Sequence, residues 1–228
     1  QTAALDALDA RHRAKARVIF QSAPALAPGH PRRTTFDVIF VGHMRAEKDP
    51  LTPMRALQRL PASSRLRLVQ VGDALEAKYA QAARELEAMS SRYQWLRALP
   101  HAATRQRIRH SRALLISSVM EGGANVVVEA VTCGVPVIAS RISGNIGMLG
   151  KDYEAYFTAG DDRELARLLE RISVDSAFLA RLRMQCAARA PLFEPARERS
   201  EVDRLVDDAL RAATRPSTAE STACAARS

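Results

Sequence analysis

Two glutamates with seven residues between them are the pair in this chain best placed to do chemistry. Glu121 follows a short apolar stretch, residues 113–117, and Glu129 lies within the next apolar stretch, residues 124–133. We expect the first stretch to form a strand and the second to form a helix. Glu121 then stands at the carboxyl end of a strand, which is the edge where open α/β sheets bind their ligands.

The start of the expected helix adds backbone donors beside these carboxylates. N–H groups at a helix N-terminus lack intrahelical partners and lie at the positive end of the helix dipole, which favours a phosphate or a sugar oxygen. Glu129 is embedded in an apolar run, where a carboxylate needs a polar partner such as a pair of ligand hydroxyls. Two acceptors beside an N–H cluster suit a nucleotide sugar. An ordinary strand–turn–helix with solvated glutamates is the alternative.

A basic loop follows an earlier expected strand. Gly42 permits a tight turn at the end of residues 36–41. His43, Arg45 and Lys48 then place cationic donors at the same sheet edge, and an arginine fork with a lysine point charge suits a diphosphate. Lys48 is the more specific candidate, because the chain has four lysines against thirty arginines. The alternative is a solvent-exposed basic loop.

Further segments fall at this edge or at helix ends. Residues 140–147 are expected to form a Gly-rich loop that lines the same crevice. Leu99 is expected to face the base of a nucleotide through its backbone, whereas His101 is interpreted as a helix-start or surface histidine. Cys133 before a glycine indicates the end of a helix, and Asp161 is interpreted as a helix N-cap.

Alternating apolar stretches define the elements that must position these residues. Uninterrupted apolar strands between helices predict a parallel sheet covered on both faces, with right-handed crossovers. The expected fold class is therefore α/β, a Rossmann-like doubly wound parallel sheet followed by C-terminal helices. The expected strands are residues 17–20, 36–41, 66–71, 93–96, 113–117, 135–140 and 154–158, and the expected helices are a short one at the start and residues 51–60, 76–89, 102–110, 124–133, 162–172, 177–190 and 195–212.

Composition narrows the possible classes. Of 228 residues, 47% are hydrophobic and 26% charged, as in soluble globular proteins. The net charge is +9, but the arginines are dispersed and aromatic residues make up 5%, so no nucleic-acid partner is expected. Cys133, Cys186 and Cys224 show no pair or metal spacing, which favours reduced thiols and a cytoplasmic location. We find no stretch suited to stable membrane insertion and no signal-peptide pattern.

The chain begins at Gln1 rather than at methionine, already within an amphipathic helical pattern. We therefore expect a piece of a longer protein. Proline and glycine mark residues 21–33 as a linker. The expected parts are residues 1–24, the remnant of a preceding domain with its hinge, residues 25–213, a nucleotide-sugar-binding domain, and residues 214–228, a disordered tail.

The order of these motifs resembles the donor-binding C-terminal domain of retaining GT-B glycosyltransferases. The resemblance covers residues 18–212 and depends on three motifs: Gly42…Lys48, Glu121-x7-Glu129 and Cys133-Gly134-Val135-Pro136. It implies that Glu129 binds the ribose hydroxyls, that Glu121 faces the transferred sugar and that Lys48 binds the diphosphate. The backbone N–H groups that would hold sugar and phosphate oxygens belong to Gly122, Gly123, Ala124, Asn125 and Val126.

Two departures from the family pattern point to unusual sugar or acceptor recognition. His43 stands where the family commonly has arginine, so Arg45 is expected to take that task, and residues 145–147 replace the usual proline–glutamate. The sequence of residues 42–50, 120–127 and 139–147 is similar to that of the selenosugar synthases of selenoneine biosynthesis. Those enzymes join selenophosphate to the sugar of a UDP-N-acetylhexosamine, and such a small anionic acceptor fits the departures.

The resemblance implies a glycosyltransferase that uses a UDP-sugar, expected to be UDP-N-acetylglucosamine, without a metal or another cofactor. Glu121, Lys48 and Arg45 would be its catalytic residues, and the anomeric configuration would be retained. Because the acceptor domain is expected to be missing, this chain would bind the donor without turnover. The alternatives are an enzyme of the same fold acting on an envelope or lipid-linked glycan, and a non-catalytic nucleotide-sugar-binding module.

Overall fold

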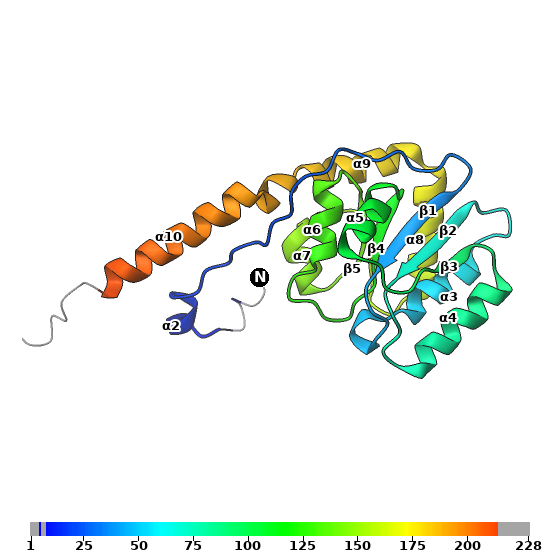
Figure 1. Ribbon diagram of the computed structural model, residues 1–228, viewed down its shortest axis with the longest axis horizontal. Coiled ribbons are helices and arrows are strands. Elements are labelled where there is room, and N and C mark those ends of the chain that lie inside the picture. Colours follow the sequence, from blue (N-terminus) through cyan, green and yellow to red (C-terminus); the bar gives the residue numbers. More distant parts are fainter. Residues whose placement is uncertain (1–4, 6–7, 214–228) are drawn as a thin grey trace, which may run out of the picture.

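The computed structural model describes residue 5 and residues 8–213, which form a parallel sheet covered by helices (Figure 1). The sheet has six strands in the order β3-β2-β1-β4-β5-β6, and every neighbouring pair is parallel. The strands are β1 (Phe36–Val41), β2 (Leu66–Val71), β3 (Tyr93–Trp95), β4 (Ala113–Ile116), β5 (Val137–Ser140) and β6 (Tyr156–Phe157). This is the doubly wound α/β fold that the alternating pattern predicts.

Helices follow the strands in turn. They are α2 (Ala10–Arg13), η1 (Ala46–Lys48), α3 (Leu51–Arg59), α4 (Ala77–Met89), α5 (His101–Arg109), α6 (Asn125–Thr132), α7 (Ser143–Leu149), α8 (Asp162–Val174), α9 (Ser176–Ala187), η2 (Ala190–Phe193) and α10 (Pro195–Ala213). Helices α3 and α8 pack together against β2, whereas α5 and α6 pack together against β1 and β5. Helix α10 extends away from the sheet, alongside the N-terminal segment (Figure 1).

The order of the strands creates the switch point at which the site lies. The chain runs outward from β1 to β3 and then returns to β4 on the other side of β1. The loops after β1 and β4 therefore diverge to opposite sides at neighbouring carboxyl ends, which leaves a crevice for a ligand. Val38, Ile39 and Leu114 in these two strands are completely buried. Their burial on both faces of the sheet fixes the strands from which the two loops depart.

Most of the predicted element ends are confirmed within a few residues. Helix α6 ends at Cys133 followed by Gly134, whose φ of 73° is a left-handed conformation that suits glycine. Asp161 caps α8 by accepting hydrogen bonds from the backbone N–H groups of Arg163 and Glu164. Cys133 and Cys186 are buried free thiols, and burial raises the pKa of both. Cys224 and the expected disordered tail at residues 214–228 lie outside the described residues.

Two predictions from the sequence are wrong. Residues 17–20 form no strand, because they run beside α10, where Arg17 pairs with Asp208 at 3.0 Å, instead of along a sheet edge. The segment at 140–147 is also not a loop throughout, since helix α7 begins at Ser143. Its glycines suggested a loop, but Gly144 and Asn145 are buried in this helix, and its packing outweighs the poor helix propensity of glycine.

The expected linker at residues 21–33 is irregular and is bound to the domain through its backbone. Ser22 donates from its N–H and from its Oγ to Glu198 at the start of α10. Arg105 donates to the carbonyl of Pro24 at 2.5 Å. Gly29 lies so close to α5 that a Cβ there would come within 2.2 Å of the Arg109 carbonyl oxygen. These contacts hold the linker against the start of α10 and along the second half of α5.

Candidate functional site

The loops that follow β1 and β4 are bonded to each other. Ser117 at the end of β4 donates from its Oγ to the carbonyls of Lys48 and Asp49, both at 2.9 Å. The N–H of Val119 donates to the carbonyl of Glu47 at 2.9 Å. Because both loops leave buried strands, these bonds fix the basic loop and the first glutamate relative to each other.

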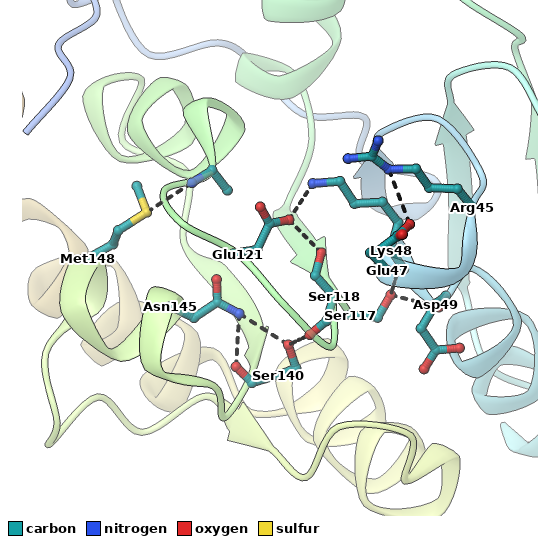
Figure 2. A network of polar contacts seen from close by, with 11 residues as sticks. Arg45, Glu47, Lys48, Asp49, Ser117, Ser118, Glu121, Ser140, Asn145 and Met148 are labelled. Carbon is teal, nitrogen blue, oxygen red and sulfur yellow. Dashed lines mark hydrogen bonds and ion pairs between the residues drawn. The ribbon is translucent and has the colours of Figure 1, made fainter. Parts of the chain in front are cut away.

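Lys48 and Glu121 form an ion pair at this junction (Figure 2). The lysine ammonium contacts Glu121 Oε1, which also accepts a hydrogen bond from Ser118 Oγ at 2.6 Å. The side chains of Lys48 and Glu121 are only 19% and 10% exposed, so this is a largely desolvated pair. The Lys48 ammonium, which can donate hydrogen bonds to phosphate oxygens, thus lies directly beside the Glu121 carboxylate, which can accept hydrogen bonds from hydroxyl groups.

A buried polar chain continues behind the glutamate (Figure 2). Asn145 Nδ2 in α7 donates to the carbonyl and to the Oγ of Ser140, at 2.9 and 3.1 Å. Ser140 Oγ donates to the carbonyl of Ser118 at 2.5 Å. Gly144 packs against the same glutamate, and a Cβ there would lie 2.1 Å from the Glu121 carbonyl oxygen. Sequence reasoning named Asn145 only as a departure and gave the serines no role.

Glu129 lies in α6 and has a different partner. His101 Nε2 is 2.5 Å from Glu129 Oε1, with the histidine side chain 75% exposed and the glutamate side chain 9% exposed. His101 begins α5 and is exposed, as predicted, but its contact with Glu129 was missed. The two residues are 28 positions apart, so no spacing signal links them. Only the parallel topology brings the starts of α5 and α6 to one edge of the sheet.

A cavity of about 270 Å³ opens beside Glu129. Its walls come from the linker, from α5 and α6, and from the start of α10. They are formed by Gln21, Ser22, Ala23, Pro24, His101, Arg105, Asn125, Val128, Glu129 and Glu198. Two carboxylates, two amides, an imidazole, a guanidinium and a hydroxyl, together with three apolar side chains, suit a polar ring with hydroxyl groups.

The turn between the two glutamates carries the expected backbone donors. Helix α6 begins at Asn125, and the N–H of Ala124 before it donates to the sulfur of Met148 at 3.3 Å. A thioether is a weak acceptor, so a phosphate or sugar oxygen would be a better partner for this N–H. A Cβ at Gly122 would meet no atom within 4 Å, so the turn is open there. Gly123 lies in this turn and Val126 is the second residue of α6, and their binding of sugar or phosphate oxygens stays a prediction.

The other predicted residues of the basic loop lie outside the Lys48–Glu121 ion pair. Arg45 is half-exposed and lies 3.6 Å from Glu47, so it has no bond to Glu121. Gly42 lies beside the stem of Lys48: a Cβ added at this glycine would be 3.7 Å from the lysine Cδ, an ordinary van der Waals distance. His43 Nδ1 accepts a hydrogen bond from the N–H of Asp73 at 3.1 Å. That nitrogen is therefore bonded within the protein, and a contact of His43 with a ligand stays a prediction.

Two backbone features complete this edge. The carbonyl of Leu99 accepts a 3.4 Å hydrogen bond from Thr104 Oγ1, so one of the backbone groups expected to face a base has an internal partner. Gly72 was not predicted as important, yet a Cβ there would come within 2.1 Å of the Gly42 carbonyl oxygen. Its φ of 129° also disfavours other residues, so glycine is required for the close approach of the loops after β1 and β2.

The fold is a doubly wound α/β sheet, and the candidate site lies at its switch point, the place where sheets of this kind bind ligands. Residues 27–191 match the family model described as glycosyl transferases group 1, and the chain belongs to this family. A search of curated proteins finds no matching sequence. Within the described residues, no helix is long and apolar enough to cross a membrane.

Several solved structures share this fold. The structure of HepE from Anabaena in complex with UDP has a TM-score of 0.68 and 21% identity, over 77% of this chain and 49% of that one. HepE has also been solved with UDP-glucose. The apo galactosyltransferase WaaB of the lipopolysaccharide outer core has a TM-score of 0.67 and 19% identity, over 85% and 56% of the two chains. The α,α-trehalose 6-phosphate synthase of Burkholderia multivorans has a TM-score of 0.69 and 17% identity, over 79% and 44%.

The chain spans about half the length of the HepE protein that it matches. At these identities the likeness establishes the fold alone. The predicted Rossmann-like α/β fold of a GT-B glycosyltransferase is confirmed. Donor binding and the roles of the individual site residues stay predictions.

Proposed function

We propose that this chain is the donor-binding half of a glycosyltransferase that uses UDP-N-acetylglucosamine. The observation that carries the proposal is the Lys48–Glu121 pair beside the start of α6. It brings together the Lys48 ammonium, the Glu121 carboxylate and backbone N–H groups at the switch point, and the ammonium can exchange Glu121 for a phosphate oxygen. A sugar diphosphate presents the complementary groups, namely phosphate oxygens next to sugar hydroxyls. That HepE was solved with UDP and with UDP-glucose supports a uridine nucleotide as the donor.

Each part of the donor has a proposed partner. The diphosphate takes Lys48, Arg45 and the N–H groups of residues 122–126, and the sugar hydroxyls take Glu121. The ribose hydroxyls take Glu129, in the cavity of about 270 Å³ beside it. Binding therefore exchanges the Lys48–Glu121 and His101–Glu129 contacts for contacts with the ligand. The nucleotide base lies toward the backbone at Leu99.

The proposed chemistry is electrostatic. When the bond between C1 of the sugar and the β-phosphate oxygen breaks, negative charge develops on the diphosphate. Lys48, Arg45 and the start of α6 stabilise this charge, because they are already oriented before the reaction. Glu121 holds the sugar, and the acceptor attacks from the face that UDP leaves, which retains the configuration at C1.

We propose selenophosphate as the acceptor. The similarity of residues 42–50, 120–127 and 139–147 to the sequences of selenosugar synthases supports this proposal. Its selenium would form the new bond to C1 as UDP leaves with the bonding electrons. Hydrolysis of the selenium–phosphorus bond then gives the 1-selenosugar and phosphate. The acceptor would bind largely to a preceding domain, so this chain alone would hold the donor without turnover.

The first test is a calorimetric titration of this chain with UDP-N-acetylglucosamine, with GDP-mannose as the control. Selective binding of the UDP-sugar supports the donor assignment. A folded chain, verified by circular dichroism, that binds neither ligand would refute it. The acceptor is tested on the full-length enzyme, by mass spectrometry of products formed with selenophosphate. Transfer to a lipid-linked glycan but not to selenophosphate would refute the acceptor and favour an envelope glycosyltransferase.

A further inference from the structure

Glu121 is held from behind by a series of hydrogen bonds, through side chains and one backbone carbonyl, that the proposed mechanism does not use. The series runs from Asn145 through Ser140 and Ser118 to the Glu121 carboxylate, and its first three residues have no solvent exposure (Figure 2). The directions of its bonds are consistent. The Asn145 amide donates to Ser140 Oγ, which donates to the Ser118 carbonyl, while Ser118 Oγ donates to the glutamate.

Helix α7 also contacts Glu121 through its backbone. Gly144, adjacent to Asn145, allows the Glu121 carbonyl to approach within a distance that any side chain would block. Tyr156 in β6 donates to the Asn145 carbonyl at 3.3 Å and to that of Gly150 at 2.8 Å, which fixes the helix itself. The loop that carries the glutamate therefore has two independent attachments to α7.

This series of hydrogen bonds ends at one oxygen of the Glu121 carboxylate. Oε1 receives both Lys48 and Ser118, whereas within the described residues Oε2 has no hydrogen-bond partner. Fixing Oε1 leaves the other oxygen to accept from a sugar hydroxyl. A carboxylate held in this way loses less side-chain entropy when it binds a ligand.

Fold stability alone does not account for this arrangement. Asn145 is completely buried, and its Oδ1 has no hydrogen-bond partner. Leaving a buried carbonyl oxygen unpaired is unfavourable, so an apolar residue would be the better choice if the position only filled space. What the asparagine provides is its Nδ2 donor, which orients Ser140 and, through it, the Ser118 backbone.

We propose that Ser118, Ser140 and Asn145 are positioning residues that set the orientation of Glu121 and thereby the preference for a sugar nucleotide over the free nucleotide. This inference rests on the proposed donor function. It assigns different roles to two adjacent buried serines. Ser118 holds the group that faces the sugar, whereas Ser117 holds the backbone of Lys48, which faces the diphosphate.

Titration of three variants of the full chain with UDP and with UDP-N-acetylglucosamine tests this separation. Since a hydrogen bond to a charged group is lost, Ser118→Ala is expected to weaken the UDP-sugar about tenfold and UDP less than about twofold. Ser117→Ala is expected to weaken both ligands by the same factor. Ser111→Ala is the matched control, because it removes a buried serine that bonds a backbone carbonyl at the other end of β4. It should change neither affinity.

Equal losses of both ligands in Ser118→Ala would overturn the proposal. Wild-type protein that binds neither ligand would refute the proposed function instead, and a second measurement tests separately whether these residues are coupled to one another. In urea unfolding, Ser118→Ala and Asn145→Ala should cost less stability together than the sum of their separate effects, because they interrupt the same chain. Additive costs would overturn the proposal without any ligand.

Discussion

Replacing Lys48 with methionine tests whether the site is neutralised internally before a donor arrives. Methionine keeps most of the lysine stem beside Gly42 but removes the ammonium. Glu121 would then be a charge with 10% exposure whose remaining partner at Oε1 is the Ser118 hydroxyl. The folded state should therefore be destabilised, even though Lys48 lies on a surface loop.

The expected magnitude follows from the burial of the pair. Removing one partner of a buried ion pair costs about 3–5 kcal/mol. The Ser118 bond and the partial exposure of Glu121 lower this to about 2–3 kcal/mol, since some hydration of the carboxylate is retained. For a domain of this size, that corresponds to a decrease in Tm of about 4–12 °C.

Urea unfolding followed by circular dichroism measures this change, with two further variants for comparison. Lys48→Met combined with Glu121→Gln should recover most of the lost stability, because glutamine has no charge and still accepts from Ser118. Lys78→Met is the matched control, since Lys78 pairs with Glu76 at 2.8 Å but is 61% exposed, and it should cause no measurable change. If Lys48→Met is as stable as this control, the pair does not stabilise the folded protein and the reasoning fails.

Three more predictions concern ligand affinity and pH. Glu129→Ala should weaken UDP, because the ribose hydroxyls lose their acceptor, whereas Glu121→Ala should weaken UDP-N-acetylglucosamine and spare UDP; equal calorimetric losses of both ligands in each variant would contradict this division. Lys48→Ala should weaken UDP more than uridine, and an equal effect on uridine would exclude its role at the diphosphate. Burial raises the pKa of Asp37, but its paired hydrogen bonds with Arg67, at 3.0 and 2.7 Å, outweigh this and leave the pKa below its usual 3.8. The pair therefore adds stability above about pH 4 that is lost as pH falls through the lowered pKa, so Asp37→Asn should flatten the acid limb of the stability profile, and an unchanged limb in acid titrations would disprove it.

Much of the fold could be predicted because its signals are local and repeated. Strands such as β1 and β4 are continuous apolar runs, and buried parallel strands require that composition. The ends of α6 and α8 follow from single residues, Cys133 before a glycine and the Asp161 cap. Each of these features is encoded within a few neighbouring residues, so no knowledge of distant contacts is needed.

The errors occur where distant contacts override local preference. Residues 17–20 have the apolar, β-branched character of a strand, but they lie against α10 instead of a sheet edge. Residues 143–149 contain two glycines and still form α7, because Gly144 and Asn145 make contacts with Glu121 and Ser140 that a loop would not provide. Helix and strand propensities describe neither kind of contact.

In the candidate site, too, the sequence identified local features and missed the contacts between distant residues. Residue type and spacing identified Lys48, Glu121 and Glu129 as candidates, since these are the groups that a nucleotide sugar needs. They did not identify the internal partners, because the pairs Lys48–Glu121 and His101–Glu129 join residues 73 and 28 positions apart. A ligand was the partner expected for Glu129, but a nearly buried carboxylate needs a partner within the fold, and His101 is that partner. If a donor binds at this site as proposed, binding exchanges partners, and its affinity then measures only the difference in free energy between the internal ion pairs and the bonds to the donor that replace them.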